Sequence, residues 1–336
     1  MLSDFFIVTA QRTHRDTTAD RQLSARVQCP RIGSSVQGLV TRGQVATVAM
    51  ANESSVFILR KVVIDSAIIV ALVILIYITD SAWLQFKRGF FCGDESLMFP
   101  YRDDTVTVPM LRLVGLGLPI YAFLICEWVL LRKEQDSVQF WFFSVPLWLR
   151  SFYCTMVSFG LGTCFLELTT NVAKKVIGRP RPHFFDLCKP SVDCTAAQWQ
   201  HKYIQNYTCL GHTPDNQDKF NDMHMSFLSG HSAWSAFTML YLALYLEKRM
   251  VWRGTRVLRH SLQFGAIMLS WFTALSRVSD YKHHWSDVLA GYFLGITLAL
   301  IMWTWGTTLI ELRKKHSPVN QNDTALPLNH QMELPA

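Results

Sequence analysis

The stretch VVIDSAIIVALVILIYIT at residues 62–79 decides the fold class of this chain. Its only charged residue is Asp65, and it lacks the polar face that an amphipathic surface helix needs. A helix of about 20 apolar residues crosses the roughly 30 Å of hydrocarbon in a bilayer. The stretch therefore predicts a transmembrane helix rather than the buried helix of a soluble bundle.

Five further apolar stretches approach the same length, at residues 108–131, 147–172, 232–247, 258–276 and 288–310. The composition agrees, since 50% of the 336 residues are hydrophobic and only 17% are charged. We therefore predict an all-α integral membrane protein with six transmembrane helices. The predicted division of the chain is a mobile cytoplasmic extension at 1–60, the membrane domain at 61–311 and a cytoplasmic tail at 312–336.

Basic residues near the span ends predict the orientation, because Lys and Arg favour the cytoplasmic side of a membrane. They are Arg60, Lys61, Arg132, Lys133, Lys248, Arg249, Arg253, Arg256, Arg259, Arg313, Lys314 and Lys315. Both termini are then cytoplasmic, and the segments 80–107, 173–231 and 277–287 face the exterior or a lumen. The net charge of +7 follows mainly from this pattern, and no basic helix or aromatic platform indicates nucleic-acid binding.

The predicted exterior loops contain residues that suit an oxidising compartment. Four of the eight cysteines lie there and are disulfide candidates: Cys92, Cys188, Cys194 and Cys209. Four cysteines allow three pairings, among which the sequence does not choose. No C-x-x-C spacing indicates a zinc site. Of the three sequons in the chain, only the one at Asn206 lies in an exterior loop, so we expect a glycan there.

Three polar clusters lie at the exterior ends of spans. The first follows the third span and runs from Lys174 to Pro182; the second is Ser229-Gly230-His231 before the fourth span; the third occupies 276–287 between the fifth and sixth. Because all three lie at one membrane level, helix packing can bring them together. Their Lys and Arg residues break the positive-inside trend, which indicates a local use for the charge.

The residue types in these clusters fit a bound phosphate. Lys174, Arg181 and Arg277 can surround it, and a guanidinium matches two phosphate oxygens at once. Ser229 and the amide of Gly230 add donors at a helix start, where the dipole favours an anion. Three cations can hold the phosphoryl charge without Mg²⁺, and no clustered Asp/Glu set indicates a metal site. We therefore predict no metal and no cofactor.

Two histidines can make this anion site reactive. His283 and Asp287 are four residues apart, so on a helical turn they share a face and the carboxylate can orient the ring. We predict that His283 is the nucleophile. His231, from a different helix, is predicted to protonate the leaving alkoxide and then to activate water. His284 has the wrong register for these roles and is interpreted as structural.

Taken together, the clusters resemble the active-site pattern of the type 2 phosphatidic acid phosphatase superfamily. That pattern is Lys, six residues, Arg-Pro; then Ser-Gly-His; then Ser-Arg, five residues, His, three residues, Asp. It is filled here by Lys174, Arg181, Pro182, Ser229, Gly230, His231, Ser276, Arg277, His283 and Asp287, with Leu228 where many members have Pro. The context GRPRPHFFDLC, SFLSGHSAW and SRVSDYKHHWSDVLAG is similar to the animal lipid phosphate phosphatases.

This resemblance implies an Mg²⁺-independent hydrolase of phosphatidate, lysophosphatidate, sphingosine 1-phosphate and ceramide 1-phosphate. It implies a phosphohistidine at His283 and an active site outside the plasma membrane. Two alternatives stay open: a catalytically inactive relative that binds membrane partners, and an endomembrane phosphatase specific for sphingoid or polyprenyl phosphates. A homo-oligomer is compatible with either.

Two charged residues outside the pattern receive separate assignments. Arg179 is predicted to bind anionic lipid headgroups. Glu167 precedes Lys174 by seven residues, hence lies on roughly the same helix face, and is predicted to pair with it.

Overall fold

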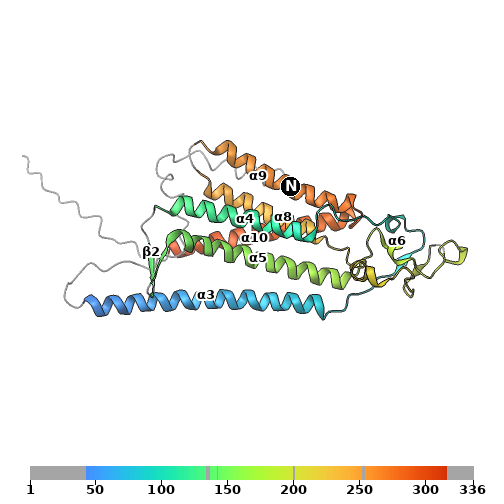
Figure 1. Ribbon diagram of the computed structural model, residues 1–336, viewed down its shortest axis with the longest axis horizontal. Helices are drawn as coiled ribbons and strands as arrows, with labels where there is room; N and C mark the ends of the chain where they lie inside the picture. The colour runs from blue at the N-terminus through green and yellow to red at the C-terminus, as the bar shows by residue number, and fades with distance from the viewer. Residues whose placement is uncertain (1–42, 134–136, 142, 200, 252–253, 316–336) are drawn as a thin grey trace, which may run out of the picture.

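The computed structural model describes residues 43–133, 137–141, 143–199, 201–251 and 254–315. Long helices cover each of the six apolar stretches and lie side by side in one bundle (Figure 1). They are α3 (Gly43–Ser81), α4 (Val108–Leu131), α5 (Leu147–Ile177), α8 (Gly230–Arg249), α9 (Arg256–Ser279) and α10 (Trp285–Lys315). The described part of the chain is therefore mostly helical, as the predicted all-α class requires, with only short strands beside the helices.

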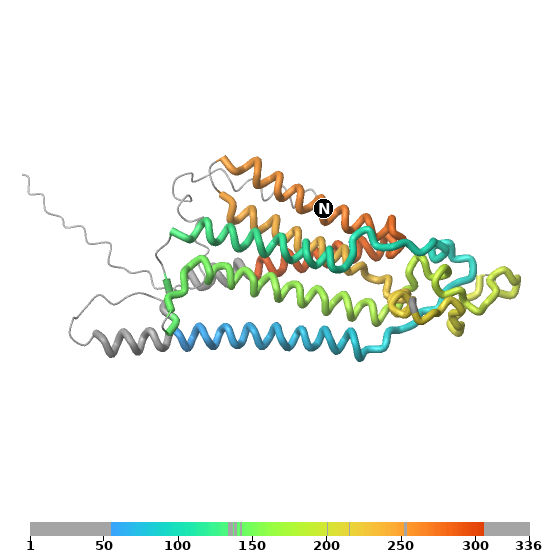
Figure 2. Tube along the Cα trace, in the orientation of Figure 1, coloured from blue at the N-terminus to red at the C-terminus, as the bar shows by residue number. Residues whose placement is uncertain are grey.

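The short elements gather at the two ends of the bundle. Near the predicted cytoplasmic end, β2 (Ser137–Phe140) pairs with β3 (Phe143–Pro146) as an antiparallel hairpin. At the other end, β1 (Phe90–Phe91) pairs with β4 (Tyr203–Ile204), close to α6 (Phe184–Cys188) and α7 (Gln217–Asp222). The segments that follow α3 and α5 fold together over this end (Figure 2). We call residues 82–107 and 178–229 the cap.

Four helices in the described residues are long and apolar enough to cross a membrane: Ser55–Ser81, Val108–Leu131, Leu147–Ile177 and Trp285–Trp305. The other two long helices, α8 and α9, do not meet this criterion. α8 packs against α4, α5, α9 and α10, so most of its surface faces protein rather than lipid. α9 has three basic side chains in its first five residues, Arg256, Arg259 and His260. Six spans thus remain a prediction.

The first long helix begins earlier than the sequence predicts. α3 starts at Gly43, so the backbone of residues 43–60 is helical and the predicted boundary at residue 60 is too late. Adding residues to an existing helix gains a hydrogen bond for each residue fixed, and no proline interrupts this stretch. The remaining extension at 1–42 and the tail at 316–336 lie outside the described residues.

Close packing of α8 against α10 aligns the two helix starts that carry the predicted histidines. A Cβ atom added to Gly291 would lie 2.4 Å from the carbonyl oxygen of Ser229, and one added to Gly295 would lie 2.4 Å from that of Ala233. Only glycine permits this approach, as in other membrane helix pairs. The amide of Ser229 also donates to the carbonyl oxygen of Asp287 at 3.1 Å.

Two disulfides hold the cap together. Cys92 bonds to Cys194, and Cys188 bonds to Cys209. The aromatic rings of Phe90 and Phe184 pack at 5.3 Å between these bridges. The four candidate cysteines are therefore all paired, in one of the three pairings that the sequence left open.

Candidate functional site

A cavity of about 330 Å³ lies where the cap meets the bundle. Six of the eight residues predicted to bind phosphate or to catalyse line it: Lys174, Arg181, Gly230, His231, Arg277 and His283. They come from α5, α8, α9, the cap and the turn between α9 and α10. The fold thus brings the three clusters, which span more than a hundred residues of sequence, into one cavity.

Lys174 lies in the last turn of α5, where a basic residue complements the helix dipole. Its amine reaches the start of α8, since a Cβ added to Gly230 would lie 3.3 Å from the Nζ atom. Gly178 then ends α5 with φ 58°, and a Cβ added there would lie 1.8 Å from the carbonyl oxygen of Phe86. Only glycine fits this turn, which directs the chain back towards the cavity.

Arg181 is fixed by a carboxylate that the sequence analysis did not identify. Its Nε donates to the carbonyl oxygen of Asp222 at 3.0 Å and its Nη2 to the side chain of Asp222 at 2.6 Å. Its Nη1 donates to the carbonyl oxygen of Lys282 at 3.3 Å. Although burial alone would raise the pKa of Asp222, the charges of Arg181 and Lys174 hold that pKa below its ordinary value. Asp222 is therefore ionised and orients the guanidinium.

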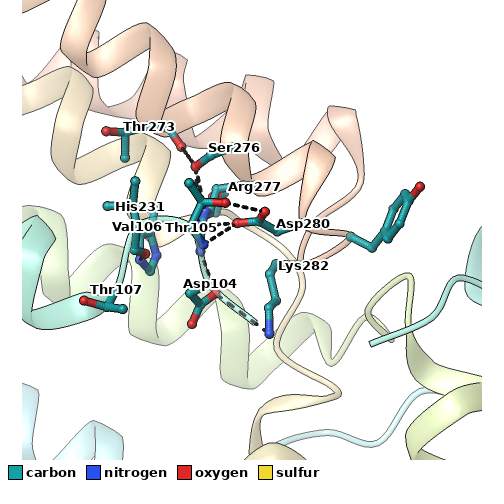
Figure 3. Close-up of polar contacts among 12 residues, drawn as sticks. Asp104, Thr105, Val106, Thr107, His231, Thr273, Ser276, Arg277, Asp280 and Lys282 are labelled. Atoms are coloured by element: carbon teal, nitrogen blue, oxygen red, sulfur yellow. Dashed lines mark hydrogen bonds and ion pairs between the residues drawn. The ribbon is translucent and has the colours of Figure 1, made fainter. Parts of the chain in front are cut away.

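Arg277 is held by acidic residues on two sides, as Figure 3 shows. Its side chain is 1% exposed, and it donates to Asp104 and to Asp280, each at 2.8 Å. Thr105 donates to the same Asp280 from its amide at 2.8 Å and from its hydroxyl at 2.7 Å. Asp104 lies 173 residues before Arg277, so no sequence spacing could have indicated this pair.

The nucleophile candidate, His283, is buried beside the cations. Its Nδ1 lies 2.6 Å from the carbonyl oxygen of Ser226. A carbonyl oxygen can only accept, so Nδ1 carries the proton and Nε2 keeps its lone pair. Burial, followed by the charges of Arg181 and Lys174, lowers the pKa of His283 well below its ordinary value. The ring is therefore neutral near pH 7.

Among its described contacts, Asp287 lacks the hydrogen bond to the ring of His283 that the sequence predicts. Asp287 instead accepts from the hydroxyl of Ser226 at 2.6 Å and from Arg179 at 2.6 Å, and lies 3.2 Å from Nδ1 of His284. The helical-face argument fails because α10 begins at Trp285, so His283 precedes the helix.

Arg179 and His284 both contact the carboxylate of Asp287. Arg179 donates to Ser286 at 2.9 Å as well as to Asp287, so it also has a structural role, and its binding of lipid headgroups stays a prediction. His284 is absent from the cavity lining, and its amide donates to Asp287 at 3.3 Å. These contacts agree with the structural interpretation of His284.

His231, the acid and base candidate, occupies the first turn of α8. Its Nε2 lies 3.0 Å from the carbonyl oxygen of Val106 and therefore donates to it (Figure 3). Nδ1 is then the ring atom that can exchange a proton with a ligand. Val106 follows Asp104 and Thr105 in the chain, so residues 104–106 of the cap contact Arg277, Asp280 and the ring of His231.

Ser229 differs from its predicted role as a phosphate donor. It is fully buried and does not line the cavity, and its hydroxyl accepts from the hydroxyl of Ser232 at 3.0 Å. Ser229 is the N-cap residue of α8, but its side chain caps no backbone amide and hydrogen-bonds to Ser232 in the first turn instead. Gly230, the next residue, is the one that borders the cavity.

Glu167 also differs from the prediction. It lines the cavity, but its Oε2 accepts from the indole nitrogen of Trp234 at 2.5 Å, and its Oε1 lies 3.9 Å from Arg112. The predicted pair with Lys174 is not among its described contacts.

In the part of the chain that the structure describes, no group of three or more His, Cys, Asp or Glu side chains is placed to hold a metal ion. Asn206, the predicted glycan acceptor, is exposed in the cap.

The chain resembles proteins of known family. Residues 155–311 match the PAP2 superfamily. The chain is 43% identical over 239 residues to a Drosophila melanogaster protein named as a candidate phosphatidate phosphatase, covering 67% of this chain and 63% of that protein. It is 40% identical over 230 residues to phospholipid phosphatase 1 of Rattus norvegicus, covering 67% of this chain and 77% of the relative. It is 33% identical over 220 residues to phospholipid phosphatase 2 of Homo sapiens, covering 64% of this chain and 72% of the relative. No solved structure matches the chain.

Proposed function

Because the chain belongs to the PAP2 superfamily, we propose that it is a membrane lipid phosphate phosphatase. Its substrates are phosphatidate, lysophosphatidate, sphingosine 1-phosphate and ceramide 1-phosphate. The observation that carries this proposal is the single cavity lined by Lys174, Arg181, Arg277, His231 and His283. A catalytically inactive relative would be expected to have lost a nucleophile, an acid or a cation, and this chain retains all of them.

The three cations bind the phosphate of the substrate. A phosphate monoester has close to two negative charges near neutral pH, and guanidinium groups match its oxygens. Asp222 and Asp104 hold Arg181 and Arg277 in place, so their orientation is set before the substrate arrives. Such preorganisation lowers the barrier because no side chain must reorder as charge develops on the phosphoryl group.

The first chemical step forms a phosphohistidine. Nε2 of neutral His283 attacks phosphorus, and the Nε2–P bond forms as the bond from phosphorus to the ester oxygen breaks. In this proposal His231 enters the step as the cation, with one proton on Nε2 towards Val106 and the other on Nδ1. The leaving alkoxide takes the Nδ1 proton and departs as the lipid alcohol, which leaves His231 neutral. The other ring proton of His283 stays on Nδ1, which donates to the carbonyl oxygen of Ser226, and this hydrogen bond stabilises the positive charge on the ring.

The second step hydrolyses this intermediate. Water attacks phosphorus while His231 takes a proton from it, and the Nε2–P bond breaks. The products are inorganic phosphate, neutral His283 and protonated His231, ready for the next cycle. Three cations neutralise the phosphoryl charge throughout, so the proposed reaction requires no Mg²⁺.

Asp287 acts on His283 through Ser226. The carboxylate accepts from the Ser226 hydroxyl, and the carbonyl of the same residue accepts from the nucleophile. Asp287 is therefore a positioning residue in this proposal rather than a group that touches the reacting atoms.

The cap, with its disulfides and the exposed Asn206, supports an active site on the exterior or luminal side. We place the enzyme in the plasma membrane with the cavity outside; an endomembrane enzyme with a luminal cavity is the alternative.

The decisive experiment is hydrolysis of the four lipid phosphates by the purified chain in excess EDTA. Release of inorganic phosphate from at least one of them, blocked by vanadate, is expected. No release with or without Mg²⁺ would favour the inactive relative, and release only with Mg²⁺ would refute the mechanism.

A further inference from the structure

Glu167 is a charged residue in a membrane-crossing helix whose partners do not account for its charge. Such residues are costly in a bilayer and are usually paired or functional. Two other acids in the same class of helix are paired: Asp65 lies 2.7 Å from the amine of Lys61, and Glu127 accepts from Nε of Arg249 at 2.9 Å. Among the described residues, the ion pair of Glu167 is the long one with Arg112, and the charge of Lys174 acts on it without a hydrogen bond.

That ion pair is weak. Its N···O distance is 3.9 Å and the side chain of Arg112 is 61% exposed, a combination that contributes little. The indole nitrogen of Trp234 satisfies Oε2 at 2.5 Å, whereas no hydrogen bond joins Oε1 to a described residue. Since Glu167 lines the cavity, this oxygen can accept a hydrogen bond from a bound molecule.

The position of Glu167 relative to the phosphate site defines which part of a substrate it meets. The amine of Lys174 lies at Gly230, and the carboxylate of Glu167 lies at Trp234. Four residues along α8 correspond to a rise of about 6 Å, directed from the cap into the bundle. A lipid phosphate with its phosphoryl group at Lys174 and its chain towards the membrane would place its next few carbon atoms at this depth.

We propose that Glu167 is a specificity residue that accepts a hydrogen bond from a hydroxyl or ammonium group near the phosphate ester. Lysophosphatidate and sphingosine 1-phosphate have such donors, whereas the glycerol oxygens of phosphatidate are acylated. A hydrogen bond to an ionised acceptor is about twice as strong as a neutral one, so donor-bearing substrates are favoured. This inference rests on the proposed function and adds a substrate preference to it.

The test compares two substrates that differ in one hydroxyl group: 1-oleoyl-lysophosphatidate and its 2-deoxy analogue. The purified wild-type chain is expected to cleave the hydroxyl-bearing substrate with kcat/KM higher by about tenfold or more, the usual effect of a hydrogen bond to a charged group. Glu167→Gln keeps an acceptor for Trp234 but removes the charge, and it should reduce this ratio to about threefold or less. The loss should fall on the hydroxyl-bearing substrate and, more strongly, on sphingosine 1-phosphate.

Glu247→Gln serves as the matched control, because Glu247 pairs with Arg259 at the far end of α8 and does not line the cavity. It should leave both kcat/KM values unchanged. Equal kcat/KM values of the wild-type chain on the two substrates would overturn the inference even if Glu167→Gln fails to fold. An equal loss of kcat/KM on both substrates in Glu167→Gln would also overturn it. A wild-type chain inactive on every lipid phosphate would instead overturn the proposed function, and this inference with it.

Discussion

Replacing Ser226 with Ala tests whether Asp287 controls the nucleophile indirectly. The variant keeps the carbonyl that accepts from His283 but removes the hydroxyl that donates to Asp287 at 2.6 Å. Both Ser226 and Asp287 are fully buried, so this hydrogen bond to an ionised group contributes about 1.5–3 kcal/mol. If that free energy holds the Ser226 carbonyl in position, kcat should fall by about 10- to 150-fold.

The assay is a double-mutant cycle with Asp287→Asn, using kcat for lysophosphatidate and the melting temperature of each purified variant. Because both residues act through one hydrogen bond, the double variant should lose little more than the stronger single variant, giving a coupling energy of about 1.5–3 kcal/mol. Ser270→Ala is the control, since Ser270 is also buried but hydrogen-bonds to Ser235 and Tyr292 instead. Additive losses, or an unchanged kcat in Ser226→Ala, would refute the indirect route.

Three further predictions concern the nucleophile, the acid stability of the cap and the sidedness of the site. His283→Ala should reduce kcat to background while His284→Ala keeps most of it, because His283 lines the cavity and His284 does not. Similar rates in the two variants would contradict this assignment. Burial lowers the pKa of both His183 and His224 to about 4, so below about pH 6.5 the unfolded chain binds protons that the folded chain does not. The free energy of unfolding should therefore fall as pH decreases from about 6.5 towards 4, by up to about 1.4 kcal/mol per pH unit for each histidine. The melting temperature should therefore decrease over this range, and His224→Gln should flatten the decrease; an unchanged slope would argue against it. Asn206→Gln should remove a glycan-sized mobility shift, and intact cells should hydrolyse added lysophosphatidate; activity seen only after permeabilisation would place the cavity on an internal membrane.

Local features of the sequence were sufficient to predict much of this protein. The apolar stretches predicted all six long helices because hydrophobic length is a property of a contiguous segment. The spacing of Lys174, Arg181, Gly230, His231, Arg277 and His283 predicted the family, and these six residues of the pattern line one cavity. The start of α3 was missed because a helix continues beyond the apolar stretch that signals it.

Only the tertiary structure decided which groups contact one another around those residues. Asp104 and Arg277 are 173 residues apart, and Asp222 and Arg181 are 41 apart, so these pairs depend on how the cap folds over the bundle. The same folding chose one disulfide pairing among three.

The environment of His283 shows why the sequence could not give these contacts. The four-residue spacing to Asp287 predicts a shared helix face, but α10 begins two residues after His283, and the ring turns to the carbonyl of Ser226 instead. Sequence determined which chemical groups the site has, because motif residues are read directly from the chain. The structure determined which of them touch, because hydrogen-bond partners are set by packing between segments that the sequence places far apart.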